Sequence, residues 1–444
     1  MHAASPTRGS YPESFRCIGP ACEDICCQGW NVPVDRETYE KYQKLPTNEL
    51  STLINANVRR NPADVREGTP SACTGDYAQM RIEGANLCPL LTSERLCRIH
   101  AEMGEEMLPH ACAIYPRIVH QFGGMKETAL ALSCPEAARL VLLDPDLLAP
   151  GSRIAAVPAD GDTDNSTKAL PPDFLAIRKS VLALLRMRSY PLWQRMFLLG
   201  LLCRRLDSIA RGELNRSVPD FLGDFKRAVA SGSLRPAMAT LPEDRTAQLD
   251  VVLRLAGLML HRSNVSPRFS ASVHAFTAGI GNGPGATLES LSNQYARAHD
   301  IAFEPFFRRN PHILENYLVN TIVRCQFPFG REGMEAGAQA ECAREFAKLT
   351  AQFALIRGLL IGVAGFHGAA FSSAHVIATV QSAAKHFEHH PEFLKLSYEL
   401  LLESRMDGAR GMAILLREAG LTTVKAELPA VAVHGPRHET RATI

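Results

Sequence analysis

The chain has no marked excess of either charge and no uninterrupted apolar run of membrane-spanning length. It carries 48 basic and 46 acidic residues among 444, a formal net charge of +2. Proteins that bind nucleic acids in general carry a clear basic excess, so we expect no nucleic-acid partner. The most apolar stretch, residues 353–366, contains Arg357 and is shorter than the roughly 20 residues that a membrane helix needs. We therefore expect no membrane insertion.

The N-terminus lacks the features of a secretion signal. It reads MHAASPTRGSYPESF, with neither an apolar run of sufficient length nor a cleavage-site context. This absence favours a cytoplasmic location. Because the cytoplasm keeps thiols reduced, disulfides are the less favoured use of the cysteines.

Cysteine is abundant and unevenly spread. Of 12 cysteines, the three after residue 135 are Cys203, Cys325 and Cys342, each in an apolar helical pattern typical of a buried thiol. The other nine lie before residue 135: Cys17, Cys22, Cys26, Cys27, Cys73, Cys88, Cys97, Cys112 and Cys134. Isolated burial does not explain nine cysteines in so short a segment.

The spacing of these cysteines favours a metal or cluster site. Cys17-x4-Cys22-x3-Cys26-Cys27 is a dense group, and Cys88, Cys97, Cys112 and Cys134 follow it. Thiolates bind zinc and iron–sulfur clusters in fours, so eight suffice for two sites, or for one cluster plus structural or catalytic thiols. The choice between zinc and iron stays open.

Two details of the first cysteine group qualify this interpretation. Side chains of adjacent residues usually diverge, so Cys26 and Cys27 are expected to serve different faces or different sites. The group also differs from the Cys-x3-Cys-x2-Cys pattern of radical-type methylases, because Gly29 stands where the third cysteine would be.

The predicted fold is mostly α, with a cysteine-rich module followed by an all-α helical domain. Residues 1–150 are rich in cysteine, proline and turns, and 151–172 form a polar linker. Residues 173–427 carry helical periodicity, for which we expect eight to ten helices. One apolar stripe consists of Phe174, Ile177, Val181, Leu184 and Leu185. Residues 428–444 read as a flexible tail.

Two further features carry weaker signals. The glycine run 279–285, GIGNGPG, has neither the Walker spacing nor the dinucleotide-binding spacing, so we interpret it as a flexible connector. His386 and His390 are four residues apart and would share one helix face. Neighbouring Lys385, Glu388 and Pro391 favour a solvated helix end over a metal site.

Four segments resemble the flagellin lysine-N-methylase family, in the family's order. They are YPESFRCIGPACEDICCQGWNVPVDRETYEKY, CPLLTSERLCRIHAEMGEEMLPHACAIYPR, ENYLVNTIVRCQFPFG and AKHFEHHPEFL. The N-terminal part is also similar to a broader group of zinc- or iron-chelating cysteine-cluster proteins. Cys73 and the chain after about residue 427 lie outside the resemblance.

The resemblance implies methyl transfer from S-adenosylmethionine to surface lysines of flagellin. It also implies a [4Fe–4S] cluster, with zinc as the alternative. Its ligands would come from Cys17, Cys22, Cys26, Cys27, Cys88, Cys97, Cys112 and Cys134. The residues themselves show no strand and glycine-rich loop for S-adenosylmethionine, so its site is not readable.

Methylation requires a neutral lysine amine, whose ordinary pKa is near 10.4. The site must therefore desolvate the ammonium group or place a base beside it. Glu23 and Asp24, among the cysteines, and Tyr115, after Cys112, are candidates for this role. The competing interpretation is that the two acids lie in a surface turn and that Tyr115 is a packing residue.

Two functions from different classes follow. The first is a cytoplasmic, cluster-dependent protein-lysine methyltransferase. The second is a zinc- or iron-chelating protein, or a redox sensor, without methyltransferase activity. The large helical domain favours the enzyme, because chelation alone does not need so extensive a recognition surface, although helical domains host many functions.

Overall fold

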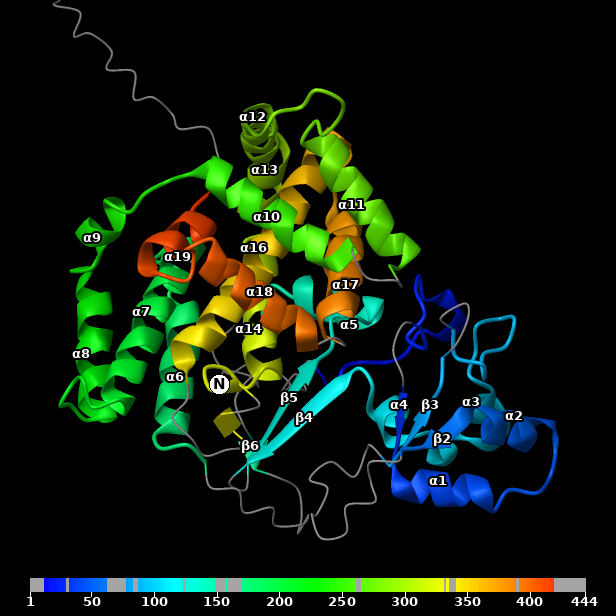
Figure 1. Ribbon diagram of the computed structural model, residues 1–444. Helices are drawn as coiled ribbons and strands as arrows, with labels where there is room; N and C mark the ends of the chain where they lie inside the picture. Colours follow the sequence, from blue (N-terminus) through cyan, green and yellow to red (C-terminus); the bar gives the residue numbers. More distant parts are fainter. Residues whose placement is uncertain are drawn as a thin grey trace, which may run out of the picture.

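The computed structural model (Figure 1) describes eleven ranges of the chain. These are residues 12–28, 32–61, 77–82, 87–122, 125–147, 157–158, 170–260, 265–330, 333–334, 341–388 and 391–418. Gly29, Cys73, His389, His390, the predicted tail 428–444 and most of the predicted linker 151–172 lie outside them.

The prediction of a mostly α fold is confirmed, and two small antiparallel sheets accompany the helices. The N-terminal elements are η1 (Gly19–Ala21), β1 (Val32–Val34), α1 (Arg36–Gln43), α2 (Glu49–Asn57), β2 (Val58–Arg60), β3 (Ala78–Met80), α3 (Arg98–Met103), η3 (Glu105–Met107) and α4 (His110–Ile114). The first sheet has the order β1-β3-β2. Asp35 and Asn48 begin α1 and α2, because their side chains accept the backbone N–H groups of Thr38 and Ser51.

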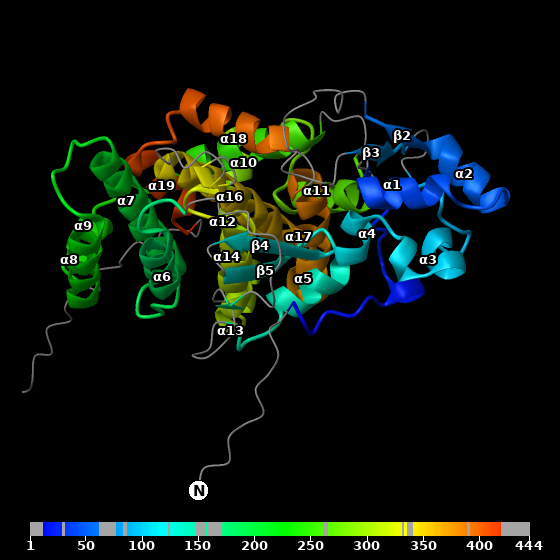
Figure 2. The ribbon, with the colours of Figure 1, turned by 90° about the horizontal axis from the view of Figure 1, so that it is seen from below.

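These elements enclose a small core of their own. Its eleven buried residues are Val32, Val34, Tyr42, Leu50, Ile54, Val58, Ala78, Met80, Cys88, Leu90 and Ile99. Cys27, Cys97 and Cys112 pack against it. We call the described residues between 32 and 112 the small module, and they lie to one side of the helical bundle in both views (Figures 1 and 2).

The second sheet belongs to the larger core. It contains β4 (Arg117–Phe122), β5 (Met125–Leu130) and β6 (Val157–Pro158), and α5 (Pro135–Leu142) follows β5. The side chain of Asn320 accepts from Leu130 N (3.1 Å) and donates to Leu130 O (2.8 Å). Glu127 forms a buried ion pair with Arg178 at 2.6 Å. The sheet is thereby tied to two helices of the bundle.

The bundle contains thirteen α-helices among the described residues, more than the eight to ten expected. They are α6 (Phe174–Leu185), α7 (Leu192–Ala210), α8 (Val218–Ser231), α9 (Arg235–Ala239), α10 (Arg245–Leu260), α11 (Pro267–Gly279), α12 (Leu288–Ala298), α13 (Glu304–Arg309), α14 (His312–Arg324), α16 (Cys342–His367), α17 (Ser373–Glu388), α18 (Pro391–Glu403) and α19 (Ala409–Leu416). A π-helical turn η4 (His299–Phe303) and a 3-10 turn η5 (Gly368–Ala370) join some of them. Short helices such as α9 account for the difference.

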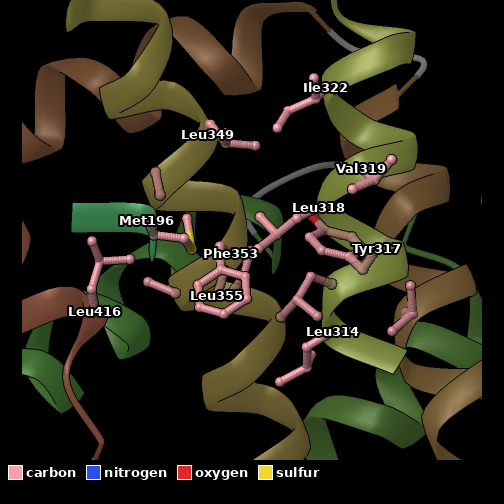
Figure 3. Packing of buried hydrophobic residues seen from close by; sticks show 14 of the residues in the cluster. Met196, Leu314, Tyr317, Leu318, Val319, Ile322, Leu349, Phe353, Leu355 and Leu416 are labelled. Carbon is pink, nitrogen blue, oxygen red and sulfur yellow. The ribbon is translucent and has the colours of Figure 1, made fainter. Parts of the chain in front are cut away.

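The central helix is α16, which contacts α7, α10, α11, α12, α17, α18 and α19 (Figure 1). Figure 3 shows its Leu349, Phe353 and Leu355 packed near Tyr317 and Leu318 of α14. The apolar stretch was expected to be too short for a membrane, but α16 and its continuation, Cys342–Ala370, are long and apolar enough by length and composition. Within the protein, 89% of the most apolar window is buried, so α16 is the core of the bundle.

Glycines allow α11 to approach α16 closely. A Cβ on Gly279 would lie 1.8 Å from Gly362 O, and one on Gly362 would lie 2.6 Å from Phe276 O. Gly279 is thus the last residue of α11 and a packing position. The sequence interpretation of residues 279–285 as a connector is therefore wrong for Gly279. The connector begins at Ile280, and Gly281 and Gly285 within it adopt positive φ angles.

Candidate functional site

The first described segment, residues 12–28, connects the two cores. Phe15 is buried in the large core, and Arg117 donates to its carbonyl at 3.0 Å. After η1 the chain reaches Cys27, whose carbonyl accepts from Cys88 N at 2.9 Å in the small module. The first cysteine group therefore lies at the junction between small module and bundle.

Short elements position the other cysteines of the site. Cys97 directly precedes α3, Cys112 lies within α4, and Cys134 directly precedes α5. All eight predicted ligands are among the described residues, and none of them is in a disulfide. Their local structures are turns and helix starts, in which the backbone and not a long element sets each thiol's position.

The charge of Cys26 reaches six of the other cysteines. Burial is the main cause of the raised pKa values of Cys22, Cys88, Cys97, Cys112 and Cys134, and the hydrogen bond with Cys26 is the main cause for Cys27. The charge of the Cys26 thiolate adds to all six. Cys17 acts in the same way on Cys22. All eight predicted ligands thus belong to one connected set of interacting thiols, although up to 117 positions separate them in the sequence.

Cys26 and Cys27 do not diverge as expected, because their sulfur atoms lie 3.7 Å apart. The hydrogen bond from the Cys27 thiol, helped by the charge of Lys385, lowers the pKa of Cys26 to about 7. The same interaction raises the pKa of Cys27, and burial adds to that effect. Of this pair, Cys26 is the thiol that ionises first.

Cys88 and Cys134 are held neutral at neutral pH. Burial raises the pKa of Cys88 to about 11 and that of Cys134 to about 12. For Cys134 the backbone N–H groups of Glu136 and Ala137 act in the opposite direction, but burial outweighs them. Metal binding needs thiolates, so a metal entering this site must displace these protons.

The donor set fits a thiolate-bound metal or cluster. Sulfur is the donor type of zinc and iron–sulfur sites, and four of the eight cysteines belong to or pack against the small apolar core, whereas Cys17 and Cys26 are exposed. The 3.7 Å between Cys26 and Cys27 matches the separation of two thiolates on one tetrahedral metal, about 3.8 Å for bonds of about 2.3 Å. The described part of the chain contains no group of three or more His, Cys, Asp or Glu side chains that is already arranged to hold a metal ion. The thiols would therefore rearrange on binding.

Two of the three candidate acid–base residues pair with cations. Asp24 is bound by Lys385, with both carboxylate oxygens 3.1 Å from Nζ. Glu23 forms an ion pair with Arg139 of α5. Both acids lie beside the cysteines, but their carboxylates contact protein groups.

Tyr115 is the third candidate, and its hydroxyl lies 3.2 Å from Ser133 Oγ. Burial raises the pKa of Tyr115 well above its ordinary value, and the charge of Cys134 adds to this. A phenol with so high a pKa can donate a hydrogen bond at neutral pH but cannot act as a base there. Its place beside Cys134 puts it at the site's edge.

The end of α17 is not solvated, contrary to the sequence interpretation. Lys385 is 8% exposed and His386 5%, and the His386 ring packs against Phe269 at 4.6 Å between centroids. The carboxylate of Glu388 accepts from Ser133 N at 3.0 Å. Charged side chains suggested solvent, but here they are paired inside the junction. His390, which was expected on the same helix face as His386, lies outside the described residues.

The comparisons with known proteins now bear on this arrangement. The family model described as "FliB lysine N-methylase C-terminal domain" matches residues 178–415, which are more than half of the chain. The chain belongs to the FliB lysine N-methylase family. The matched region includes α17, so the family domain itself contacts the cysteine-bearing segments. No solved structure matches the chain.

Curated relatives agree with this assignment. The chain is similar to the flagellar biosynthetic protein FliU of Salmonella muenchen, with 30% identity over 156 residues, which cover 34% of this chain and 86% of the relative. It is also similar to the lysine-N-methylases of Salmonella typhimurium and Salmonella choleraesuis, with 29% identity over 152 residues. Those matches span 34% of this chain and about a third, 35%, of each methylase.

Sequence reasoning missed the residues of α17 that face the cysteines. Gln381 donates to Asp24 Oδ2 at 2.7 Å and to Ser133 O at 2.8 Å. The segment AKHFEHHPEFL contributed to the family resemblance, but its polar residues gave no sign of burial. Only the fold shows that a helix some 360 positions away holds the first cysteine group.

Proposed function

We propose that the chain is an S-adenosylmethionine-dependent methyltransferase that N-methylates surface lysines of flagellin. The observation that carries the proposal is the family domain over residues 178–415, whose helix α17 contacts the turns that carry Cys22, Cys26, Cys27 and Cys134. The names of the relatives point to lysine methylation and to the flagellum. A cytoplasmic location follows from the same proposal, because flagellin would be modified before its export.

The cysteines would hold a [4Fe–4S] cluster. Cys17, Cys22, Cys26, Cys27, Cys88, Cys97, Cys112 and Cys134 are the donors available for it. When bound, such a cluster supplies a charged, redox-active centre whose properties respond to nearby hydrogen bonds and burial. The protein groups around it supply buried surroundings, the Tyr115 hydroxyl and the cation of Lys385.

Methyl transfer itself needs a lone pair on the lysine nitrogen. The nitrogen attacks the methyl carbon, the carbon–sulfonium bond breaks, and S-adenosylhomocysteine leaves with that electron pair. The substrate ammonium must lose its proton beforehand, which burial of the lysine in an apolar surrounding favours. Asp24 and Glu23 are already paired with cations, so desolvation of the substrate amine is the route that this structure supports better.

The test is an anaerobic assay with recombinant flagellin and S-adenosylmethionine. Intact-mass analysis should show flagellin gaining mass in steps of one methyl group. The Cys26→Ser, Cys27→Ser double variant should lose this activity. Cys325→Ser, a cysteine outside the eight, is the matched control and should keep it. Unchanged flagellin mass with the metal-loaded wild-type protein would reject the proposal.

One observation favours a second function, that of a zinc- or iron-chelating or redox-sensing protein. The sulfur separation of Cys26 and Cys27 fits two ligands of a single tetrahedral ion. Stoichiometric zinc without iron or sulfide, together with no methyl transfer, would support this alternative.

A further inference from the structure

One face of α17 contacts two separate cysteine-bearing turns. Gln381, Lys385 and Glu388 follow each other at spacings of four and three residues, so they share one side of the helix. The first turn is residues 22–27, with Cys22, Cys26 and Cys27. The second is residues 131–134, which ends in Cys134.

Lys385 and Gln381 hold the first turn. Lys385 Nζ lies 3.1 Å from each carboxylate oxygen of Asp24 and donates to Ile25 O at 2.8 Å. Gln381 Nε2 donates to Asp24 Oδ2 at 2.7 Å. The ammonium group thus contacts both residues immediately before Cys26.

Gln381 and Glu388 hold the second turn. Gln381 Nε2 also donates to Ser133 O at 2.8 Å. The two carboxylate oxygens of Glu388 accept from Leu132 N at 3.2 Å and Ser133 N at 3.0 Å. Glu388 is in turn held by Arg324 Nε, 3.3 Å from Oε1. The backbone just before Cys134 is therefore fixed on both its donor and its acceptor side.

These contacts are enclosed by protein. The side chains of Lys385, Asp24 and Glu388 are 8%, 11% and 3% exposed. Removing one member of a buried ion pair leaves a charge without compensation, which is strongly destabilising. Gln381 donates to both turns, so α17 ties them to each other. Glu23 of the first turn also pairs with Arg139 of α5, the helix that directly follows the second turn.

We propose that α17 is the element that positions the cysteine site, with Gln381, Lys385 and Glu388 as positioning residues. They hold the turn of Cys22 and Cys26 against the turn of Cys134, so that thiols from both turns share one metal or cluster site. The inference rests on the proposed function only in taking the cysteines as that site. It also explains why a helical family domain and a cysteine module occur in one chain.

The test compares Lys385→Met with wild type, using the full chain without metal. Hydrogen exchange by mass spectrometry reports on the two turns, and the rate of alkylation reports on the buried Cys134. We expect both to rise about tenfold or more in the variant, because the turns detach from α17. Exchange in α10 and α16 should stay unchanged, which shows that the bundle is folded.

Two further variants make the result specific. Lys348→Met is the matched control, since Lys348 forms a comparable ion pair with Glu345 at 2.6 Å on α16, and it should leave both rates unchanged. Combining Asp24→Asn with Lys385→Met removes the uncompensated carboxylate and should restore part of the lost protection.

A metal titration separates this inference from the proposed function. Zinc alone, added to the metal-free proteins, should bind Lys385→Met at least about tenfold more weakly than wild type. The inference would be overturned if Lys385→Met is folded and its hydrogen exchange, alkylation rate and zinc affinity all stay within about twofold of wild type. If wild type transfers no methyl group, but Lys385→Met still changes exchange, alkylation and zinc affinity as expected, only the proposed function is rejected.

Discussion

The two cores of this protein are built in different ways. Among the described residues, the core of the small module has eleven buried hydrophobic residues, one of them Cys88, with Cys27, Cys97 and Cys112 packed against them. The large core is formed by long helices, and most of the 26 residues of α16 are buried in it. The fraction of surface buried on folding rises with the size of a domain. Apolar contacts can therefore stabilise the large core by themselves, whereas those of the small module stabilise it only marginally.

The difference assigns separate roles to the two regions. The bundle is a scaffold held by a large apolar core, and the small module is a group of short elements around thiols. Small domains with few buried residues are often completed by a metal, whose binding energy becomes folding energy. The thiols would thus stabilise the module as well as form the site.

The largest expected effect comes from removing the thiol donors. The Cys26→Ser, Cys27→Ser variant should lose most hydrogen-exchange protection in β1, β3 and α1, whereas α16 keeps its own. Structural thiolate sites contribute about 10 kcal/mol or more, comparable with the stability of a whole small domain. Equal protection of the module in both proteins would show that apolar contacts suffice there.

The second largest effect is expected in the large core. Phe353→Ala removes a ring that is 1% exposed in the centre of the bundle (Figure 3). We expect the free energy of unfolding of the bundle to fall by about 3–5 kcal/mol, as for other buried phenylalanines. Ile301→Ala is the control, because that side chain is 70% exposed, and denaturant unfolding of both variants is the measurement. A change below about 1 kcal/mol for Phe353→Ala would contradict the assignment of α16 as the central core helix.

A smaller effect concerns Asp35 in the small module. Its carboxylate begins α1 by accepting from Thr38 N (2.9 Å) and also accepts from His110 N (2.9 Å) at the start of α4. Asp35→Ala should destabilise the module by about 1 kcal/mol at neutral pH, the usual contribution of a helix-capping side chain. Hydrogen exchange of the module measures this change.

The same residue predicts a pH dependence. Burial acts to raise the pKa of Asp35, but the hydrogen bonds from His110 and Thr38 outweigh it and lower the pKa below its ordinary value. A depressed folded-state pKa means that the stabilisation is present above about pH 4 and is lost as the pH falls through the folded-state pKa. The difference between wild type and Asp35→Ala should therefore shrink in acid. A difference that is constant down to pH 3 would contradict this role.

The periodic part of the fold could be predicted from the sequence. The stripe Phe174, Ile177, Val181, Leu184 and Leu185 is buried along α6, as its spacing indicates. The β4–β5 hairpin was missed, because RIVHQF and MKETAL lack a clean alternation of apolar and polar residues. Contacts between β5 and α14 in the folded protein, and not a local pattern in the sequence, determine the strand conformation there.

The candidate donors could be read from the sequence, but the residues that hold their backbone could not. Cysteine spacing alone singled out eight thiols as ligands, and this assignment stays a prediction, because no three His, Cys, Asp or Glu side chains of the described residues stand in positions that could hold a metal. The pairing of Asp24 with Lys385 was not readable, since 361 positions separate the two residues. A buried lysine looks like a surface lysine in sequence, so the end of α17 was interpreted wrongly.

The most direct test of this account is the metal content of the protein after anaerobic purification. We would measure the absorption spectrum and the iron, sulfide and zinc content of wild type and of the Cys26→Ser, Cys27→Ser variant. The account predicts iron and sulfide in matched amounts with a broad band near roughly 400 nm, both lost in the variant. A wild-type protein that folds fully and contains neither iron nor zinc would contradict it.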